Sequence, residues 1–146
     1  MGTTLVCLWL GAKQIDLVHV GDSRAYRFRA GKLKQVTSDH TVSRYLIEEG
    51  TVEAGSVEAK QVGHILTQAI GLENVLEPEV LRLHYRPGDI FLLCSDGLSD
   101  LVGEQTIAHI IAETSPNFEE GSQALVQAAL DAGGIDNITV VLAGRI

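Results

Sequence analysis

Two aspartates stand at the ends of predicted strands, where carboxylates can reach a metal ion. Asp96 follows the apolar run Ile90–Cys94 and precedes a glycine, and Asp136 lies just before the strand-like run Ile138–Leu142. A side chain at a strand end beside glycine is open to a ligand. If the two carboxylates converge, their repulsion raises one pKa unless a divalent cation such as Mg²⁺ or Mn²⁺ lies between them. The pattern therefore permits a metal site built from oxygen ligands.

A structural role is the alternative for each aspartate. Asp96 could cap the helix that is predicted to follow it, and Asp136 could close an Asx-turn before the last strand. Ser-Asp-Gly and Asp-Asn sequences are common in such roles, so spacing alone does not favour the metal site.

The elements that must position these aspartates alternate between groups of strands and groups of helices. Apolar and alternating runs predict the following strands: 3–10, 14–20, 25–29, 33–37, 79–85, 90–94 and 138–143. We expect the first four to form an antiparallel meander of two hairpins. Helical periodicity predicts the segments 41–49, 57–70, 103–113 and 118–132. This order indicates a layered α+β domain and not a doubly wound parallel sheet.

Composition indicates one soluble domain over residues 1–146, with 45% hydrophobic residues. The formal net charge of −8 argues against nucleic acid and against an anionic membrane as partners, because both require a basic surface. The longest apolar stretch, Leu5–Leu10, is far shorter than a membrane span. Cys7 and Cys94 lie in apolar runs without zinc-ligand spacing, so we expect reduced cysteines and a cytoplasmic protein.

Five short motifs, taken together in order, resemble those of the type 2C metal-dependent protein serine/threonine phosphatases (PPM), especially the compact bacterial members. The resemblance covers essentially the whole chain and rests on Gly2-Thr3-Thr4, Val20–Tyr26, Thr37–His40, Leu93–Leu98 and Gly133–Val140. It implies a layered α-β-β-α sandwich of two antiparallel sheets flanked by helix pairs, with the metals in a cleft at one end.

The resemblance also implies roles for individual residues. Asp96 and Asp136 would be ligands of a binuclear Mn²⁺/Mg²⁺ centre, and Asp39 would hold a third, more weakly bound ion. Asn137 would orient Asp136 or a metal-bound water, and Gly97 would lie beside the ligands.

Two further charged residues of the motifs, Asp22 and Arg24, are expected to be structural. We expect them to form a salt bridge or hydrogen bond within the Gly-Asp-Ser-Arg turn, with a role beside the metal ligands as the alternative for Asp22. His40 is interpreted as packing near a helix N-terminus and not as a general acid. The other histidines look scattered, without ligand spacing. Residues 41–71 correspond to the family's variable flap, where substrate contact is expected.

The implied reaction is dephosphorylation of phosphoserine or phosphothreonine in proteins, by a water that two metal ions activate and without a phosphoenzyme. An alternative from another class is a non-catalytic module that binds a phosphoprotein or a partner chain. A purely structural cation site is a third, weaker alternative.

Two motifs that open the family's catalytic domain are not found in this sequence: the Arg and Asn-Glu-Asp segment, and Asp-Gly-x-Gly-Gly with its shared metal ligand. We therefore expect an N-terminally truncated sandwich with open sheet edges or apolar faces. Weak Mn²⁺ binding and little activity follow as expectations. So does coverage of the open surface, either by a homo-oligomer or by a missing N-terminal segment.

Overall fold

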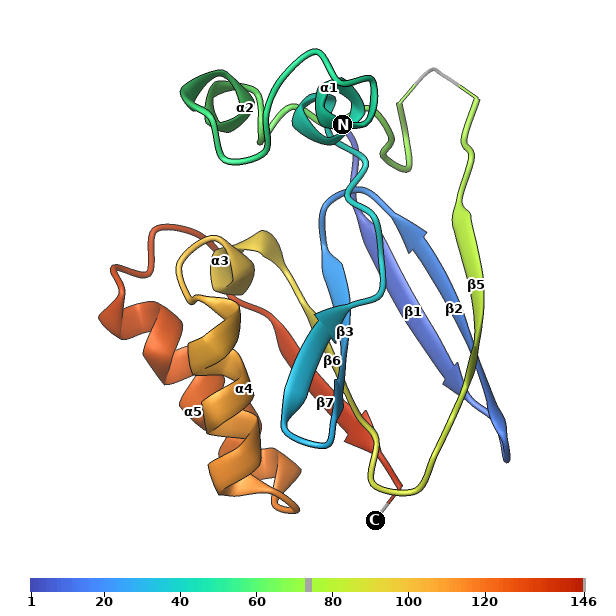
Figure 1. The fold of residues 1–146 in the computed structure, drawn as a ribbon, viewed down its shortest axis with the longest axis vertical. Coiled ribbons are helices and arrows are strands. Elements are labelled where there is room, and N and C mark those ends of the chain that lie inside the picture. Colours follow the sequence, from blue (N-terminus) through green and yellow to red (C-terminus); the bar gives the residue numbers. More distant parts are fainter. Residues whose placement is uncertain (73–74, 146) are drawn as a thin grey trace.

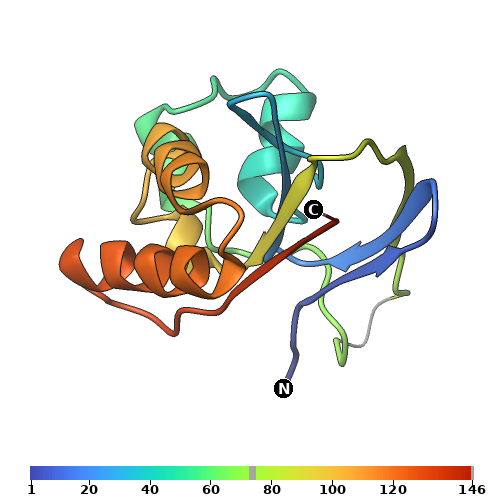
Figure 2. The same ribbon diagram turned by 90° about the horizontal axis from the view of Figure 1, so that it is seen from below.

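The computed structural model describes residues 1–72 and 75–145, which form two antiparallel sheets and a set of helices. The three-stranded sheet has the order β1-β2-β5, and the four-stranded sheet has the order β4-β3-β6-β7. Figures 1 and 2 show the two sheets facing each other. The strands are β1 (Leu5–Leu10), β2 (Gln14–Val20), β3 (Arg24–Arg29), β4 (Lys32–Gln35), β5 (Glu79–His84), β6 (Ile90–Cys94) and β7 (Val140–Gly144).

Both predicted hairpins are present, but the predicted four-stranded meander is wrong. β1 pairs with β2 and β3 pairs with β4, whereas β2 and β3 belong to different sheets. The chain leaves β2 through Gly21, whose φ of 105° is readily accessible only to glycine. A Cβ on Gly21 would also lie 2.4 Å from Thr4 Cγ2, so the turn is tightly packed. The remaining partners of β2 and β3 come from β5 and β6, and the paired residues are 60 to 70 positions apart in the sequence.

A pair of amphipathic helices, α4 (Glu104–Thr114) and α5 (Phe118–Asp131), covers the outer face of the four-stranded sheet (Figure 1). Ile107 and Leu125 of these helices are fully buried, as is Leu92 of β6. Each such side chain contributes roughly 1.5–3 kcal/mol through burial. This core fixes β6, the central strand whose end carries Asp96.

The outer face of the three-stranded sheet is open. Within the described residues no helix covers it in either view (Figures 1 and 2). Leu5 is 40% exposed, Trp9 74% and Val80 70%. No helix of the described residues is long and apolar enough to span a bilayer.

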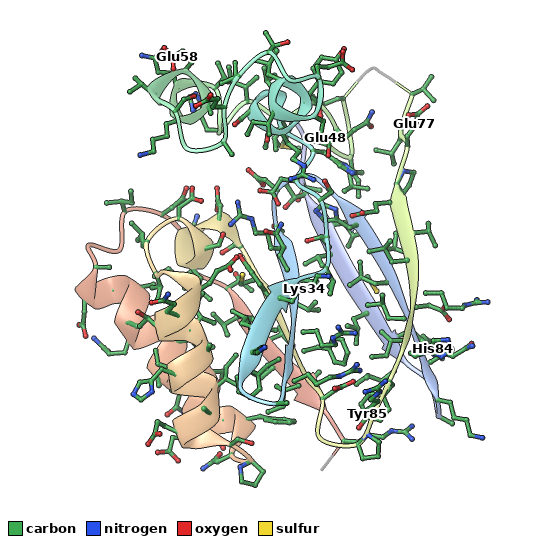
Figure 3. The ribbon with its side chains drawn as sticks, viewed as in Figure 1. Lys34, Glu48, Glu58, Glu77, His84 and Tyr85 are labelled. Carbon is green, nitrogen blue, oxygen red and sulfur yellow. The ribbon has the colours of Figure 1, made fainter. Side chains whose placement is uncertain are left out.

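The flap, residues 41–71, lies above one end of both sheets (Figure 1). It contains α1 (Val42–Glu48), capped by Thr41, and α2 (Val57–Gln61), capped by Ser56. Figure 3 shows the acidic side chains Glu48 and Glu58 on this part of the surface.

The helix predicted over 57–70 is wrong in length, because α2 ends at Gln61. The following residues pair with distant backbone instead. Leu66 forms a β-bridge with Thr41, and Ile70 forms one with Thr3. These tertiary hydrogen bonds outweigh the local helical periodicity of the apolar residues.

Candidate metal centre

Asp96 and Asp136 lie on two loops that are tied together by backbone and hydroxyl hydrogen bonds. The Ser95 N–H donates to the Thr139 carbonyl (3.1 Å), and the Thr139 N–H donates to Ser95 Oγ (3.0 Å). Ser95 Oγ in turn donates to the Asn137 carbonyl (3.0 Å). Because Ser95 immediately precedes Asp96, and Asn137 immediately follows Asp136, these bonds bring the two aspartate-bearing segments side by side.

Gly97 makes this close approach possible. A Cβ at position 97 would lie 2.4 Å from the Asn137 carbonyl oxygen, which is too close for any side chain. Glycine is therefore required for packing between the loops, which is a physical reason for its place next to Asp96.

Both aspartates also bond to their own loops. Asp96 is the first residue of the short helix α3 (Asp96–Ser99), and its Oδ1 accepts from the Gly97 N–H at 2.8 Å. Asp136 Oδ1 accepts from the Asn137 N–H at 2.6 Å. Such local hydrogen bonds are of the kind expected if the two aspartates only cap a helix or close a turn. They engage one oxygen of each carboxylate, so the other oxygen can still bind a ligand.

Asp22 and Asp100 add two more carboxylates to this end of the fold. The pKa of Asp22 is raised, first by burial and next by the negative charge of Asp96. The pKa of Asp100 is raised by partial desolvation of its carboxyl group and by the charges of Asp96, Asp39 and Asp136, although Arg24 opposes the shift. We call Asp22, Asp39, Asp96, Asp100 and Asp136 the acidic cluster. Its members repel one another, and a divalent cation would relieve that repulsion.

Asp100 is a residue that the sequence reasoning missed. It follows Asp96 by four positions, and the Asp100 N–H donates to the Asp96 carbonyl at 2.9 Å. An i, i+4 pair in a helical turn lies on one face, so the spacing Asp-Gly-x-x-Asp was the signal that could have revealed it.

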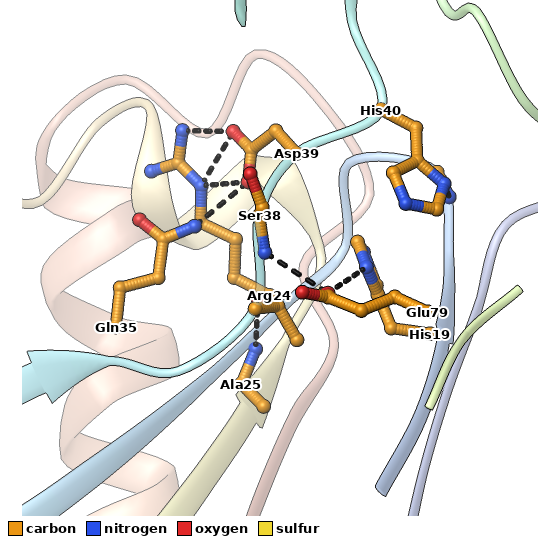
Figure 4. Close-up of polar contacts among 10 residues, drawn as sticks. His19, Arg24, Ala25, Gln35, Ser38, Asp39, His40 and Glu79 are labelled. Carbon is orange, nitrogen blue, oxygen red and sulfur yellow. Dashed lines mark hydrogen bonds and ion pairs between the residues drawn. The ribbon is translucent and has the colours of Figure 1, made fainter. Parts of the chain in front are cut away.

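The predicted contact between Asp22 and Arg24 is wrong. Arg24 instead forms a salt bridge with Asp39. Its Nε lies 2.9 Å and its Nη2 2.6 Å from Asp39 Oδ2 (Figure 4). Gln35 Nε2 donates to Asp39 Oδ1 at 2.8 Å. Arg24 is the first residue of β3, so its side chain reaches across to the segment that follows the neighbouring strand β4 and not back into its own turn.

The predicted ligands Asp96, Asp136 and Asp39 are not gathered into a ready three-carboxylate site. Among the described residues, a different set of potential ligands lies close together: His19, His40 and Glu79. Each offers one donor atom, and these three atoms all lie within 4.8 Å of one another. Asp39 is held by Arg24, as described above. Asp96 and Asp136 lie on adjacent loops. The charges of Asp39, Asp96 and Asp136 all raise the pKa of Asp100, so the three carboxylates lie in the same region.

His19 is not an isolated histidine, contrary to the sequence interpretation, because its ring lies against that of His40. Their rings lie 4.8 Å apart between centroids, and His19 is fully buried. His40 precedes the α1 cap Thr41, as the helix N-terminal interpretation expected, and its Nδ1 accepts from the Gly21 N–H at 3.3 Å. The pKa of His40 is lowered by burial and by the neighbouring His19.

A cleft of about 860 Å³ is lined by flap residues and by two members of the acidic cluster, whereas Asp22, Asp96 and Asp136 are not among its lining residues. Asp39 and Asp100 lie on one side of it. The flap contributes Arg44, Lys60 and His64 to the lining. The cleft thus places basic side chains opposite carboxylates.

Comparison with known proteins agrees with this architecture. The family model described as protein phosphatase 2C matches residues 1–132. The chain is 38% identical over 143 residues to the serine/threonine protein phosphatase PstP of Mycobacterium tuberculosis, covering 98% of this chain and 27% of PstP. It is 36% identical over 142 residues to the protein phosphatase PhpP of Streptococcus pneumoniae, covering 97% of this chain and 57% of PhpP.

A solved structure shares the fold and holds metal. The crystal structure of the PstP catalytic domain in complex with two manganese ions matches with a TM-score of 0.83 and 39% identity, covering 97% of this chain and 58% of that one. The two antiparallel sheets and helices of this chain, together with its structural match to that domain, confirm the expected α+β sandwich. The chain therefore belongs to the protein phosphatase 2C family. It spans less than two thirds of the length of these relatives.

Proposed function

We propose that this chain takes part in metal-dependent dephosphorylation of phosphoserine and phosphothreonine in proteins. The observation that carries the proposal is the pairing of the Asp96 and Asp136 loops through Ser95 and Thr139. That pairing supports a shared site for the two carboxylates, and Asp100, four residues after Asp96, lines a cleft of about 860 Å³. Family membership supplies the class of reaction.

The acidic cluster suits Mn²⁺ or Mg²⁺. Its donors are carboxylate oxygens, which hard divalent cations prefer, and the pKa values of Asp22 and Asp100 are raised first by burial and then by neighbouring carboxylates. Asp96 and Asp136 would hold the ions through the oxygens that their local hydrogen bonds leave free. Bound in pairs, such ions supply a Lewis acid for the phosphoryl group and a water of lowered pKa. The PstP domain with two manganese ions is a related precedent.

Asp39 would bind a third ion only weakly. Both of its oxygens already accept hydrogen bonds, from Arg24 and from Gln35. An ion at Asp39 must therefore compete with a guanidinium group, whose charge-assisted bonds to a carboxylate are strong. Asn137 and Gly97 would act by position: Gly97 admits the Asn137 carbonyl, and the Asn137 N–H orients the Asp136 carboxylate.

The phosphoprotein substrate would lie in the cleft between the flap and the acidic cluster. Arg44 and Lys60 line the flap side and could contact acidic or phosphorylated segments of a substrate. Arg44 is already paired with Glu48 at 2.7 Å on the exposed helix α1, so its charge is only partly available.

A non-catalytic binding module is the second candidate. It is favoured by one observation: within the described residues the three predicted aspartates do not form a compact ligand group, and Asp39 is neutralised by Arg24. Such a module would keep the cleft and bind a phosphoprotein without hydrolysing it.

We further propose that the chain works in the cytoplasm and associates through the open face of its three-stranded sheet. Cys7 and Cys94 are both free thiols, which suits a reducing compartment. The exposed side chains of Leu5, Trp9 and Val80 form an apolar surface that a second copy of the chain could cover.

Release of phosphate from a phosphothreonine peptide tests the hydrolytic proposal. We expect release that requires Mn²⁺, that is lost in Asp96→Asn, and that persists in the control Asp131→Asn, an exposed aspartate at the end of α5. Peptide binding without release by folded wild-type protein would instead support the binding module.

A further inference from the structure

A second group of potential metal ligands lies at the junction of the two sheets and the flap, apart from the acidic cluster. It consists of His19 on β2, His40 in the segment before α1, and Glu79, the first residue of β5 (Figure 4). Three segments that are distant in the sequence thus converge on one point. None of these side chains has a part in the proposed hydrolysis.

The donor atoms are close to coordination geometry. His19 Nδ1 lies 3.1 Å from Glu79 Oε2. Each of the three residues offers one donor atom, and these atoms all lie within 4.8 Å of one another. Two ligands of a tetrahedral Zn²⁺, each bonded at about 2.0–2.2 Å, are separated by about 3.4 Å. The His19–Glu79 distance of 3.1 Å is about 0.3 Å shorter than that value, and a movement of the partly exposed His40 ring, which now accepts from the Gly21 N–H, would complete the set.

The hydrogen bonding of His19 leaves an unmet requirement. Its side chain is fully buried, and Nε2 has no hydrogen-bond partner among the described residues. Nδ1 faces a carboxylate oxygen that already accepts the Ser38 N–H at 3.0 Å. In the Nδ1–H tautomer Nδ1 donates to Glu79 and the Nε2 lone pair faces no donor, whereas in the Nε2–H tautomer the Nδ1 lone pair faces the Glu79 oxygen with no proton between them. A cation is a partner for such a lone pair.

We propose that His19, His40 and Glu79 form a binding site for one Zn²⁺-class transition-metal ion, separate from the acidic cluster. Two imidazoles and one carboxylate are the donor set that Zn²⁺ favours, with a water as fourth ligand, whereas Mg²⁺ and Mn²⁺ prefer all-oxygen sites. The intermediate exposure of His40 and Glu79 gives the ion a route from solvent.

Such an ion would join the flap to the sheets. His40 directly follows Asp39 and directly precedes Thr41, whose hydroxyl caps α1 by accepting the Arg44 N–H at 3.2 Å. Fixing His40 to β2 and β5 would therefore fix the start of the flap. The role is one of stability and positioning, and it does not depend on turnover at the acidic cluster.

Zn²⁺ titration in excess Mg²⁺, read by competition with a chromophoric chelator, tests the site. We expect one Zn²⁺ per wild-type chain, an affinity at least about tenfold lower in His40→Ala and in Glu79→Gln, and no change in His109→Ala, an exposed histidine of α4. Asp96→Asn should bind Zn²⁺ as the wild type does. Equal affinity in His40→Ala, or loss of Zn²⁺ binding in Asp96→Asn, would overturn the proposal.

Two further readouts separate loss of a ligand from loss of folding. Zn²⁺ should raise the thermal unfolding midpoint of the wild type but not that of His40→Ala, whose circular dichroism should match the wild type. X-ray absorption of the Zn²⁺-loaded wild type should show imidazole nitrogen in the first coordination shell. A shell made only of oxygen would assign the ion to the acidic cluster and refute the site.

Discussion

Arg24 shows how one side chain organises the charged end of the fold. It holds Asp39 through two nitrogens, its Nη1 donates to the Tyr26 hydroxyl at 3.2 Å, and its charge opposes the rise in the pKa of Asp100. Burial raises the pKa of Tyr26 to about 12, so this hydroxyl stays neutral and interacts with Arg24 through a hydrogen bond and not as a phenolate. Arg24 is thus the counter-ion that lets several carboxylates coexist before any metal is bound.

Removal of this counter-ion should be costly. We predict that Arg24→Met lowers the free energy of unfolding by about 2–3 kcal/mol, because it leaves a half-buried carboxylate without its partner. Arg44→Met, which breaks the exposed pair with Glu48, should cost no more than about 0.5 kcal/mol. Urea denaturation of both variants measures the difference, and equal losses would contradict the importance given to the Arg24–Asp39 pair.

Asp22 should make stability fall as pH rises. Its folded-state pKa is raised above the ordinary value of 3.8, so the folded protein holds this proton more tightly than the unfolded chain does. Stability is then lost as pH rises from about 3.8 through the raised pKa. In the presence of a chelator, Asp22→Asn should be more stable than wild type at pH 7, and the gain should disappear below pH 3.8. A variant that is less stable at pH 7 would show that Asp22 is needed as an anion.

Some residues of the candidate site could be predicted from the sequence, and others could not. Asp96 and Asp136 could be singled out because each adjoins a predicted core strand. The partner of Arg24 could not, because Asp39 lies 15 positions away and meets it only through the pairing of β3 with β4. Asp100 and the His19–His40 contact were missed for related reasons, since both depend on tertiary or helical placement that spacing alone does not reveal.

At the scale of elements, the junction between β6, α3 and the segment before β7 determines where the two metal-ligand candidates lie. The strand pairing of β6 with β7 runs from Ile90–Gly144 to Cys94–Val140, and the Ser95–Thr139 bonds continue it. The Asn137 loop can approach α3 this closely only because position 97 has no side chain.

Gly97→Ala should therefore disturb both stability and metal binding. The new methyl group would press on the Asn137 carbonyl, and we expect a loss of about 1–3 kcal/mol in unfolding free energy together with weaker Mn²⁺ binding. Gly103→Ala is the matched control, because a Cβ at Gly103 meets no atom within 4 Å. Chemical denaturation and calorimetric titration test the pair; a Gly97→Ala protein with unchanged stability and affinity would refute this account of the junction.

Local patterns predicted the elements better than their partners. The turns after β1 and β3, and the periodicity of α4 and α5, are encoded by neighbouring residues. The pairing of β2 with β5 depends on residues about 60 positions apart, for example His19 with Glu79, so no local pattern indicates it. Likewise, α2 ends early because the chain after it bonds to Thr41 and Thr3.

For the molecule as a whole, the two sheets differ in how they are covered. One sheet is packed under α4 and α5, whereas in the described residues the other leaves Leu5, Trp9 and Val80 exposed. The layered α+β class followed from the order of strands and helices. The open outer face of the three-stranded sheet agrees with the expectation of an exposed apolar surface. That a second copy of the chain covers this face stays a proposal.

Trp9 should be central to self-association. We predict concentration-dependent dimers of the wild-type chain by analytical ultracentrifugation, and at least tenfold weaker association of Trp9→Ser, because its large exposed side chain is the type that dominates interface energies (hot spots of about 2 kcal/mol or more). Tyr45→Ser, which removes an exposed aromatic ring from α1 in the flap, serves as the control. A strictly monomeric wild type would remove the proposal that a second copy covers this face.

The central claim is that Asp96 and Asp136, brought together by their paired loops, share a divalent-cation site. Calorimetric titration of Mn²⁺ into the wild type, Asp136→Asn and the control Asp131→Asn tests it most directly. We predict that the wild type and Asp131→Asn bind Mn²⁺ with equal affinity, and that Asp136→Asn binds at least about tenfold more weakly while remaining folded. Unchanged Mn²⁺ binding in Asp136→Asn would contradict the claim, because the loop pairing would then bring together two carboxylates that do not serve one metal site.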